Sequence, residues 1–219
     1  AYAAARGGVD VLVFTGGIGE NGDTVRNASS NGLDFIGDEI VVISSANEKI
    51  KIYTDKGQIT AALTQEECDL FDLSGKILLC AGDEEIHVIS PENEKLYTYD
   101  SNLTFVAATD VSRLCREKIL ITCMRKNILS GAIYVGLKNG TVFKISKTNH
   151  IECVFDPQTY HIKVDSMNDF VFFDGNWFVI EQGRRRLYKC GDRARFYCWE
   201  SWNEWILKMD VCGRKLIVA

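Results

Sequence analysis

A repeated strand-turn-strand pattern is the feature that most restricts the fold of this chain. Short runs rich in β-branched and aromatic residues recur from about residue 38 onward, separated by turn residues. Four stretches share one form, in which a strand ends in small or polar residues and a turn leads to an alternating strand: VVISSANEKIKIYT, LLCAGDEEIHVIS, IYVGLKNGTVFKIS and WFVIEQGRRRLYKCG. Aligned on Ile50, Ile86, Val142 and Leu187, they are 36, 56 and 45 residues apart. Such spacings are typical of four-stranded units that stack on one another.

Two of these stretches resemble a known repeat. VGLKNGTVFKIS and SSANEKIKIYTDKGQI are similar to the hairpin between the second and third strands of a blade in WD40-like β-propellers, although the usual Gly-His and Trp-Asp dipeptides are absent. The resemblance implies about four blades over residues 38–219 and an incomplete propeller, because the final RKLIVA stops within a strand. An all-β sandwich is the alternative. Unpaired strand edges need a cover, which is either another chain or a missing segment, and the first case predicts a protein partner on the β region.

The first 37 residues have a different pattern of expected secondary structure. AYAAA favours a helix that ends at Gly7 and Gly8, VDVLVF suits a buried parallel strand, and TGGIGENG is a flexible turn. A second helix is expected from about Asp23 to Asn31. The predicted fold class is therefore mainly β, with a partial β-propeller-like repeat region (38–219) preceded by a short α/β fragment (1–37).

The α/β fragment carries the more specific resemblance. AYAAARGGVDVLVFTGGIGENGDTVR, continued by NGLDFIG, resembles the C-terminal domain of acetate kinase and its acyl-kinase relatives in the actin-like ATPase superfamily. Glycines after a buried strand let the backbone approach a ligand, and helix N-termini favour anions. By resemblance, the residues that would line the adenosine side of an ATP site are Gly16, Gly17, Ile18, Gly19 and Asn21. Taken without the resemblance, the same pattern is often only a tight connection.

The resemblance also limits the activity. In acetate kinases the acetate pocket, the catalytic Asp and the arginines and histidine of the transition state lie upstream of this segment, and none of those motifs occurs in residues 1–219. No catalytic residue is therefore assigned. The family holds Mg²⁺ with a glutamate in a Thr-x-Glu-Glu stretch, and TQEE at 64–67 makes Glu66 a candidate metal-associated carboxylate. A solvated turn between blades is the preferred interpretation of TQEE.

Composition narrows the remaining classes of function. The net charge of −5 and a pI near 5.3 argue against a general nucleic-acid surface, although GRRRLYK followed by RARFYCW mixes arginines with aromatic rings. No apolar run is long enough to span a membrane, and AYAAARGG is not a signal peptide. The eight cysteines lack CxxC or zinc spacing, so we expect buried reduced thiols and a cytoplasmic protein.

The histidines and the aromatic cluster favour structural roles. His87, His150 and His161 are scattered, which predicts satisfied or exposed side chains rather than a catalytic set. FYCWESWNEW is expected to pack between blades rather than to form a peptide-binding cleft. Two functions follow: an ATP-side fragment of an acetate kinase, using ATP and Mg²⁺ but not active as this chain alone, or a non-catalytic β-propeller scaffold for protein partners.

Overall fold

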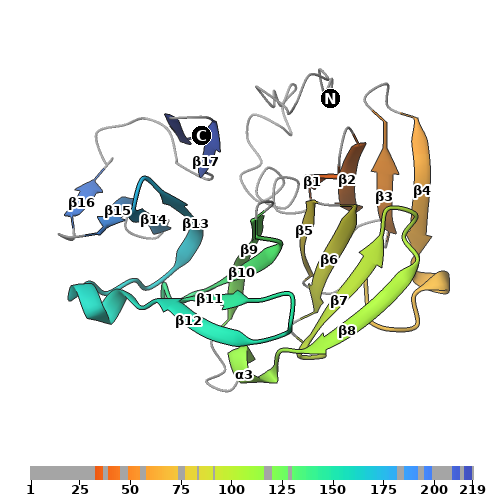
Figure 1. The fold of residues 1–219 in the computed structure, drawn as a ribbon, viewed down its shortest axis with the longest axis horizontal. Helices are drawn as coiled ribbons and strands as arrows, with labels where there is room; N and C mark the ends of the chain where they lie inside the picture. The colour runs from red at the N-terminus through yellow and green to blue at the C-terminus, as the bar shows by residue number, and fades with distance from the viewer. Residues whose placement is uncertain are drawn as a thin grey trace. The chain divides into compact units, whose positions relative to one another are not determined.

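Antiparallel sheets account for nearly all of the regular structure that can be described. The computed structural model describes residues 33–36, 39–44, 49–54, 58–73, 77–82, 84–90, 92–115, 120–127, 130–181, 185–191, 195–198, 209–212 and 215–218 (Figure 1). Within each sheet of these residues, every strand pairs with the strands that precede and follow it in sequence. In β3 (Lys49–Tyr53) the side chains of Ile50 and Ile52 are buried, whereas the residues at the three alternate positions are partly exposed. This period of two fits a strand with one face against a core.

The chain divides into two units, of which the first comprises Ala1–Arg113 and Arg125–Gly131. Its described residues form two four-stranded sheets. Their strands are β1 (Leu33–Ile36), β2 (Glu39–Ser44), β3 and β4 (Ile59–Thr64), then β5 (Leu78–Gly82), β6 (Glu85–Ser90), β7 (Lys95–Asp100) and β8 (Phe105–Asp110). The 3-10 helix η2 (Gln65–Glu67) follows β4. Ile50, Ile52 and Leu63 from the first sheet share one apolar cluster with Ile86 and Val88 from the second, so the two sheets bury their faces against each other.

Exposure rises from the first strand to the last in the second sheet. All five residues of β5 are buried, whereas β8 has no buried residue. The outer strand pairs on one side only, and among the described residues it carries two of the large exposed apolar side chains, Phe105 and Val106. The inner strands therefore supply most of the apolar burial that holds this sheet in place.

The second unit comprises Leu114–Met124 and Ala132–Ala219. Its elements are β10 (Ala132–Leu137), β11 (Val142–Ile145), β12 (Ile151–Phe155), η3 (Pro157–Tyr160), β13 (Met167–Phe173), β14 (Asn176–Glu181), β15 (Arg186–Cys190), β16 (Arg195–Cys198), β17 (Met209–Cys212) and β18 (Lys215–Val218). The short helix α3 (Ser112–Cys115) and strand β9 (Ile121–Asn127), which pairs with β10, are each divided between the two units. Val142 and Phe155 pack with Met167, Phe170 and Val179, so a common core joins the β9–β12 and β13–β16 sheets.

The mainly β fold is confirmed, but the sequence alignment placed one hairpin a strand too early. VVISSANEKIKIYT, IYVGLKNGTVFKIS and WFVIEQGRRRLYKCG contain the second and third strands of their sheets, whereas LLCAGDEEIHVIS contains β5 and β6, the first and second. The equivalent of Ile50 in the second sheet is Leu96 on β7 rather than Ile86. Ile50, Leu96, Val142 and Leu187 are 46, 46 and 45 residues apart. The repeat is therefore more regular than the sequence suggested.

The turn after each third strand repeats with the same spacing. The backbone N–H groups of Thr54, Asp100 and Ser146 donate to the carbonyl oxygens four residues later, at Gln58, Thr104 and His150. In return, the side-chain oxygens of Thr54, Asp100 and Ser146 accept from the backbone N–H groups of those residues, over 3.2, 2.8 and 3.1 Å. Three turns spaced 46 residues apart thus close in the same way, each with a short oxygen-bearing side chain.

The expected boundary at residue 37 stays a prediction. Residues 1–32, which include the predicted first strand and both predicted helices, lie outside the described residues, and the same is true of residues 199–208 in the aromatic stretch. Strand β1, which ends just before the expected boundary, pairs with β2 just after it.

Candidate functional site

The residues predicted to contact ATP cannot be located. Gly16, Gly17, Ile18, Gly19 and Asn21 all lie outside the described residues, so their nucleotide role stays a prediction.

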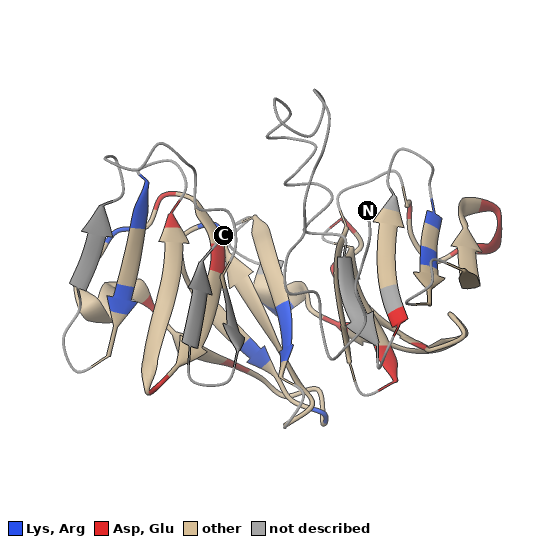
Figure 2. Cartoon of the chain, turned by 90° about the horizontal axis from the view of Figure 1, so that it is seen from above, with Lys and Arg blue, Asp and Glu red and all other residues tan. Residues whose placement is uncertain are grey.

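Glu66, the predicted metal-associated carboxylate, lies in η2, the red helical turn in Figure 2, and its side chain is exposed. Its neighbour Glu67 closes the turn, because Oε2 of Glu67 accepts from the backbone N–H and the hydroxyl of Thr64, both over 3.0 Å. These hydrogen bonds, the backbone one first, lower the pKa of Glu67. The stretch forms an exposed turn between β4 and β5, as the preferred interpretation expected. The described residues contain no group of three or more His, Cys, Asp or Glu side chains arranged to hold a metal ion. The metal role of Glu66 remains a prediction.

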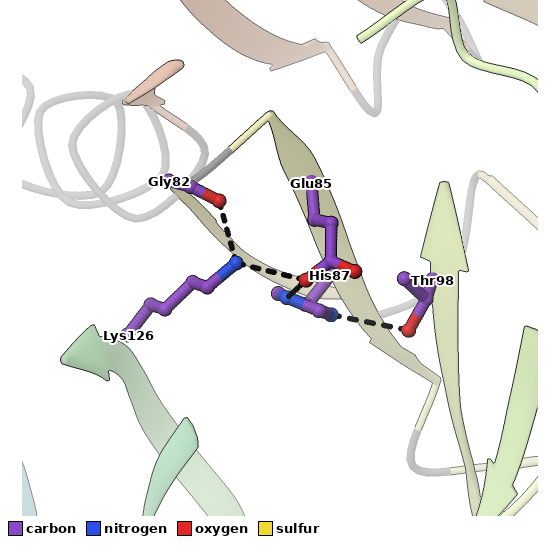
Figure 3. Close-up of polar contacts among 5 residues, drawn as sticks. All are labelled: Gly82, Glu85, His87, Thr98 and Lys126. Carbon is purple, nitrogen blue, oxygen red and sulfur yellow. Dashed lines mark hydrogen bonds and ion pairs between the residues drawn. The ribbon is translucent and has the colours of Figure 1, made fainter. Parts of the chain in front are cut away.

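The described residues bring together one polar cluster that the sequence did not predict (Figure 3). Lys126, near the end of β9, donates from Nζ to the carbonyl oxygen of Gly82 over 2.5 Å and to Oε2 of Glu85 over 3.1 Å. The side chain of Lys126 is only 1% exposed. Nε2 of His87 lies 3.4 Å from the same Glu85 oxygen. One carboxylate oxygen thus faces both a buried ammonium group and an imidazole.

His87 is held by β6 in the middle of its sheet. Its Nδ1 lies 3.1 Å from the hydroxyl of Thr98 on β7, where the direction of donation depends on the tautomer. The side chain is buried, and Nε2 has no hydrogen-bond partner among the described residues. Burial, followed by the charge of Lys126, lowers the pKa of His87 to about 4, against a smaller opposing effect of Glu85. At neutral pH the imidazole is therefore uncharged.

The other two histidines are exposed, as the sequence analysis expected. His150 follows the turn that begins at Ser146, and His161 ends η3 in the left-handed conformation. His87 differs from the expectation of a satisfied or exposed ring, because it is buried and Nε2 lacks a hydrogen bond. Lys126 gave no sequence signal, since a lysine near a strand end usually reaches solvent.

Two buried carboxylates in the second unit have structural partners. Glu181 accepts a hydrogen bond from the Tyr188 hydroxyl and another from the backbone N–H of Asp165, each over 2.7 Å. Oδ2 of Asp169 accepts from the backbone N–H of Met209 over 2.8 Å and so attaches β17 to β13. Hydrogen bonds of this kind let a carboxylate remain buried.

The five cysteines whose side chains are described form no disulfide with one another: Cys68, Cys80, Cys123, Cys153 and Cys190. Burial raises the pKa of Cys190 to about 11 and, with Asp156 nearby, also raises the pKa of Cys153. Neither thiol is therefore an activated nucleophile. In the part of the chain that can be described, no helix combines the length and apolar character that crossing a membrane requires.

The N-terminal stretch is similar to acetate kinases. Residues 1–70 match the model of the Acetokinase family. The acetate kinase of Porphyromonas gingivalis is 55% identical over 51 residues, which are 23% of this chain and 12% of that protein. The enzymes of Thermoanaerobacterium thermosaccharolyticum and Phocaeicola vulgatus are 45% identical over 62 residues and 42% identical over 71, covering 23% and 31% of this chain. The chain spans only 16% and 18% of those two relatives.

Solved structures match the β region by fold. A streptogramin B lyase matches with a TM-score of 0.58 and 13% identity over 83% of this chain and 59% of its own. Virginiamycin B lyase from Staphylococcus aureus matches with a TM-score of 0.58 and 12% identity, over 85% of this chain and 61% of its own. Saccharomyces cerevisiae Sqt1 gives a TM-score of 0.51 at 16% identity, over 83% of this chain and 52% of its own. Such low identities show the fold alone.

The two similarities overlap. The stretch matched by the family model includes Glu66 and the whole first sheet, β1 to β4, and so continues beyond the expected boundary at residue 37. The chain therefore combines an N-terminal stretch similar to acetate kinases with a propeller-like β fold over most of its length.

Proposed function

We propose that the chain binds ATP through Gly16, Gly17, Ile18, Gly19 and Asn21 but does not transfer a phosphoryl group on its own. The observation that carries the proposal is the similarity of residues 1–70 to acetate kinases, which includes TGGIGEN. Gly16, Gly17 and Gly19 would bring the backbone close to the nucleotide, and Asn21 would supply a polar contact. Mg²⁺ would accompany the nucleotide and neutralise charge on its phosphates, with Glu66 as the candidate carboxylate.

Inactivity of the isolated chain is the second part of the proposal. Phosphoryl transfer depends on positioning both substrates and on cationic groups that stabilise the developing charge. The chain spans 12–18% of its acetate kinase relatives, and the motifs of the acetate pocket do not occur in it. The expected reaction, formation of acetyl phosphate from ATP and acetate, would therefore need the remainder of a kinase from another source.

Calorimetric titration of the full chain with ATP and Mg²⁺ tests the binding. Gly17→Asp places a side chain and a negative charge in the loop, so we expect an affinity at least about tenfold weaker. Gly175→Asp is the matched control, because Gly175 lies in the turn between β13 and β14 with open space around it; its φ of +71° strains any side chain, although aspartate adopts such angles more often than most residues. Equal affinities for the two variants, or no heat with the unmodified chain, would refute ATP binding.

Hydroxylamine trapping tests the missing transfer activity. With ATP, Mg²⁺ and acetate present, we expect no acetyl hydroxamate above a protein-free blank. Product that forms with the unmodified chain and disappears with Gly17→Asp would show that this chain carries a working active site.

A non-catalytic scaffold for protein partners is the second candidate function. It is favoured by β8, the outer strand of its sheet, where Phe105 and Val106 are exposed beside an unpaired edge. Val106→Lys should reduce the set of proteins captured by proximity labelling, whereas Gln158→Lys, at an exposed position of η3, should not. Identical sets for the two variants would remove β8 from consideration. We place the protein in the cytoplasm, in keeping with the absence of a disulfide among the five described cysteines, and propose no nucleic-acid or membrane partner.

A further inference from the structure

We propose that Lys126, Glu85 and His87 form an acid-operated latch, in which protonation of His87 releases Lys126 from Glu85 and Gly82 and frees the end of β9. The latch consists of the three side chains and the Gly82 carbonyl shown in Figure 3. It does not depend on the ATP-binding proposal.

In the closed latch, one carboxylate, that of Glu85, balances one buried cation, that of Lys126, and a second cation on His87 would be unfavourable. Lys126 donates two hydrogen bonds, and Glu85 is the carboxylate that faces its ammonium group. Oε2 of Glu85 lies 3.1 Å from Nζ of Lys126 and 3.4 Å from Nε2 of His87. A proton on His87 would set two cations against one carboxylate oxygen in a site where both cationic side chains are at most 6% exposed.

The groups around His87 come from four strands. Glu85 is on the same strand, Lys126 comes from β9, and the cross-strand neighbours are Thr98 on β7 and Cys80 on β5. Thr98 does not titrate, and the thiol of Cys80 is neutral at acidic pH. Lys126 is the cation that opposes protonation of the ring, and Glu85 is the carboxylate that favours it.

When His87 is protonated, we expect the end of β9 to move rather than β6. His87 lies in β6, which is paired on one side with β5 and on the other with β7. Among the strands that the structure describes, β9 is the last of its sheet and pairs with β10 alone. Moving the end of β9 therefore disrupts one ladder, whereas moving β6 would disrupt two. We therefore expect hydration of a charged His87 to displace Lys126 and the residues next to it, beside the half-exposed side chain of Glu85.

The direction of the pH effect follows from the two pKa values. In the closed latch the pKa of His87 is about 4, and in an open, hydrated form it returns to the ordinary 6.5. Acid therefore favours the open form: the closed latch is fully stable above pH 6.5 and loses stability as the pH falls towards 4. From these values the opening constant should rise about twentyfold between about pH 7 and about pH 5.

Amide hydrogen exchange of the full chain measures the opening. Once corrected for intrinsic rates, exchange at Lys126, Asn127 and Gly131 should accelerate by about this factor from pH 7 to pH 5, while the amides of β6 and β7 stay protected. In His87→Asn, which keeps a partner for Thr98 but cannot titrate, the acceleration should vanish. In His150→Asn, a change at an exposed histidine, it should persist. Acceleration that survives His87→Asn, or that extends equally through β5 to β8, overturns the proposal.

A second measurement keeps the test decisive if His87→Asn does not fold. Lys126→Met retains an apolar stem and removes the cation, so the pKa of His87 read from its ring signals should rise. Lys144→Met removes a cation that pairs with Glu152 in the second unit and should leave the His87 pKa unchanged. A His87 pKa that does not respond to Lys126→Met would show that the two groups are not coupled and would refute the latch.

Discussion

Gly136 on β10 shows how closely two sheets approach in the second unit. A Cβ at this position would collide with the terminal methyl of Met167, and would lie 2.6 Å from Sγ of Cys123 and 2.9 Å from Cδ1 of Phe170. Met167 and Phe170 belong to β13, so the missing side chain lets β13 pack directly onto the β10 backbone. The sequence marked this residue only as a small residue before a turn, because a glycine required for packing looks the same as one required for flexibility.

We expect Gly136→Ala to lower the free energy of unfolding by about 1–3 kcal/mol, because an added methyl forces its buried neighbours out of place. Chemical denaturation measures the loss. Cys123→Ala removes one of the atoms with which the new methyl collides. The double variant should therefore lose less free energy of unfolding than the sum of the losses in the two single variants. Strict additivity would show that the collision is not the cause.

Two tyrosines provide a test of buried hydrogen bonding. The Tyr188 hydroxyl donates to the buried carboxylate of Glu181, whereas the Tyr97 hydroxyl donates to the neutral carbonyl of Leu70 over 2.9 Å. Hydrogen bonds to charged groups are the stronger kind, so Tyr188→Phe should cost about 1.5–3 kcal/mol and Tyr97→Phe about 1 kcal/mol. Urea denaturation of the two variants compares them directly. A larger loss for Tyr97→Phe would contradict a stronger hydrogen bond at Tyr188.

At the scale of elements, the turns after the third strands are the repeated device. Asp100 is the strongest of the three closing residues, because its Oδ1 accepts from the backbone N–H groups of both Asn102 and Thr104. We expect Asp100→Ala to cost about 1–2 kcal/mol and Ser146→Ala less, by analogy with side chains that cap helices. Asp100→Asn should retain most of the stability. Thermal unfolding checks the order, and equal losses for Asp100→Ala and Ser146→Ala would contradict it.

These elements also show what the sequence could and could not predict. The alternating strands and turn residues predicted the β fold and three of the four central hairpins correctly. The misplaced hairpin arose because β5, β6 and β7 are joined by two similar short turns, so either pair of strands fits the pattern. The alignment of the repeats could have been fixed by the uniform spacing of Thr54, Asp100 and Ser146. Because these are three different residue types, the sequence did not show that each supplies a side-chain oxygen to the same turn. The cluster at His87 could not be predicted, because Lys126 is distant in sequence from Glu85 and His87 and belongs to a strand of a different sheet.

At the scale of the whole molecule, the burial of the cysteines predicts a pattern of reactivity. Among the five cysteines whose side chains are described, Cys153 is exposed and the other four are buried. In the folded chain at about pH 8, iodoacetamide should modify Cys153 at least about a hundredfold faster than Cys68 or Cys190, which react only after local opening. Mass spectrometry of the labelled peptides measures the rates, with Cys153→Ser as the control. Similar rates for all five would show that the cores of both units open freely.

The uniform spacing of the three turns bears on how a chain of this kind can change in length. Asp100 and Ser146 close equivalent turns, so excision of residues 101–146 would join Asp100 to Lys147 and leave a turn that again ends at His150. In the shortened protein, β7 would pair with β12 in place of β8, and the turn between them would have the same length as the present turns. Recombination at these points would therefore add or remove one complete 46-residue module in a single step and keep a turn of the same geometry.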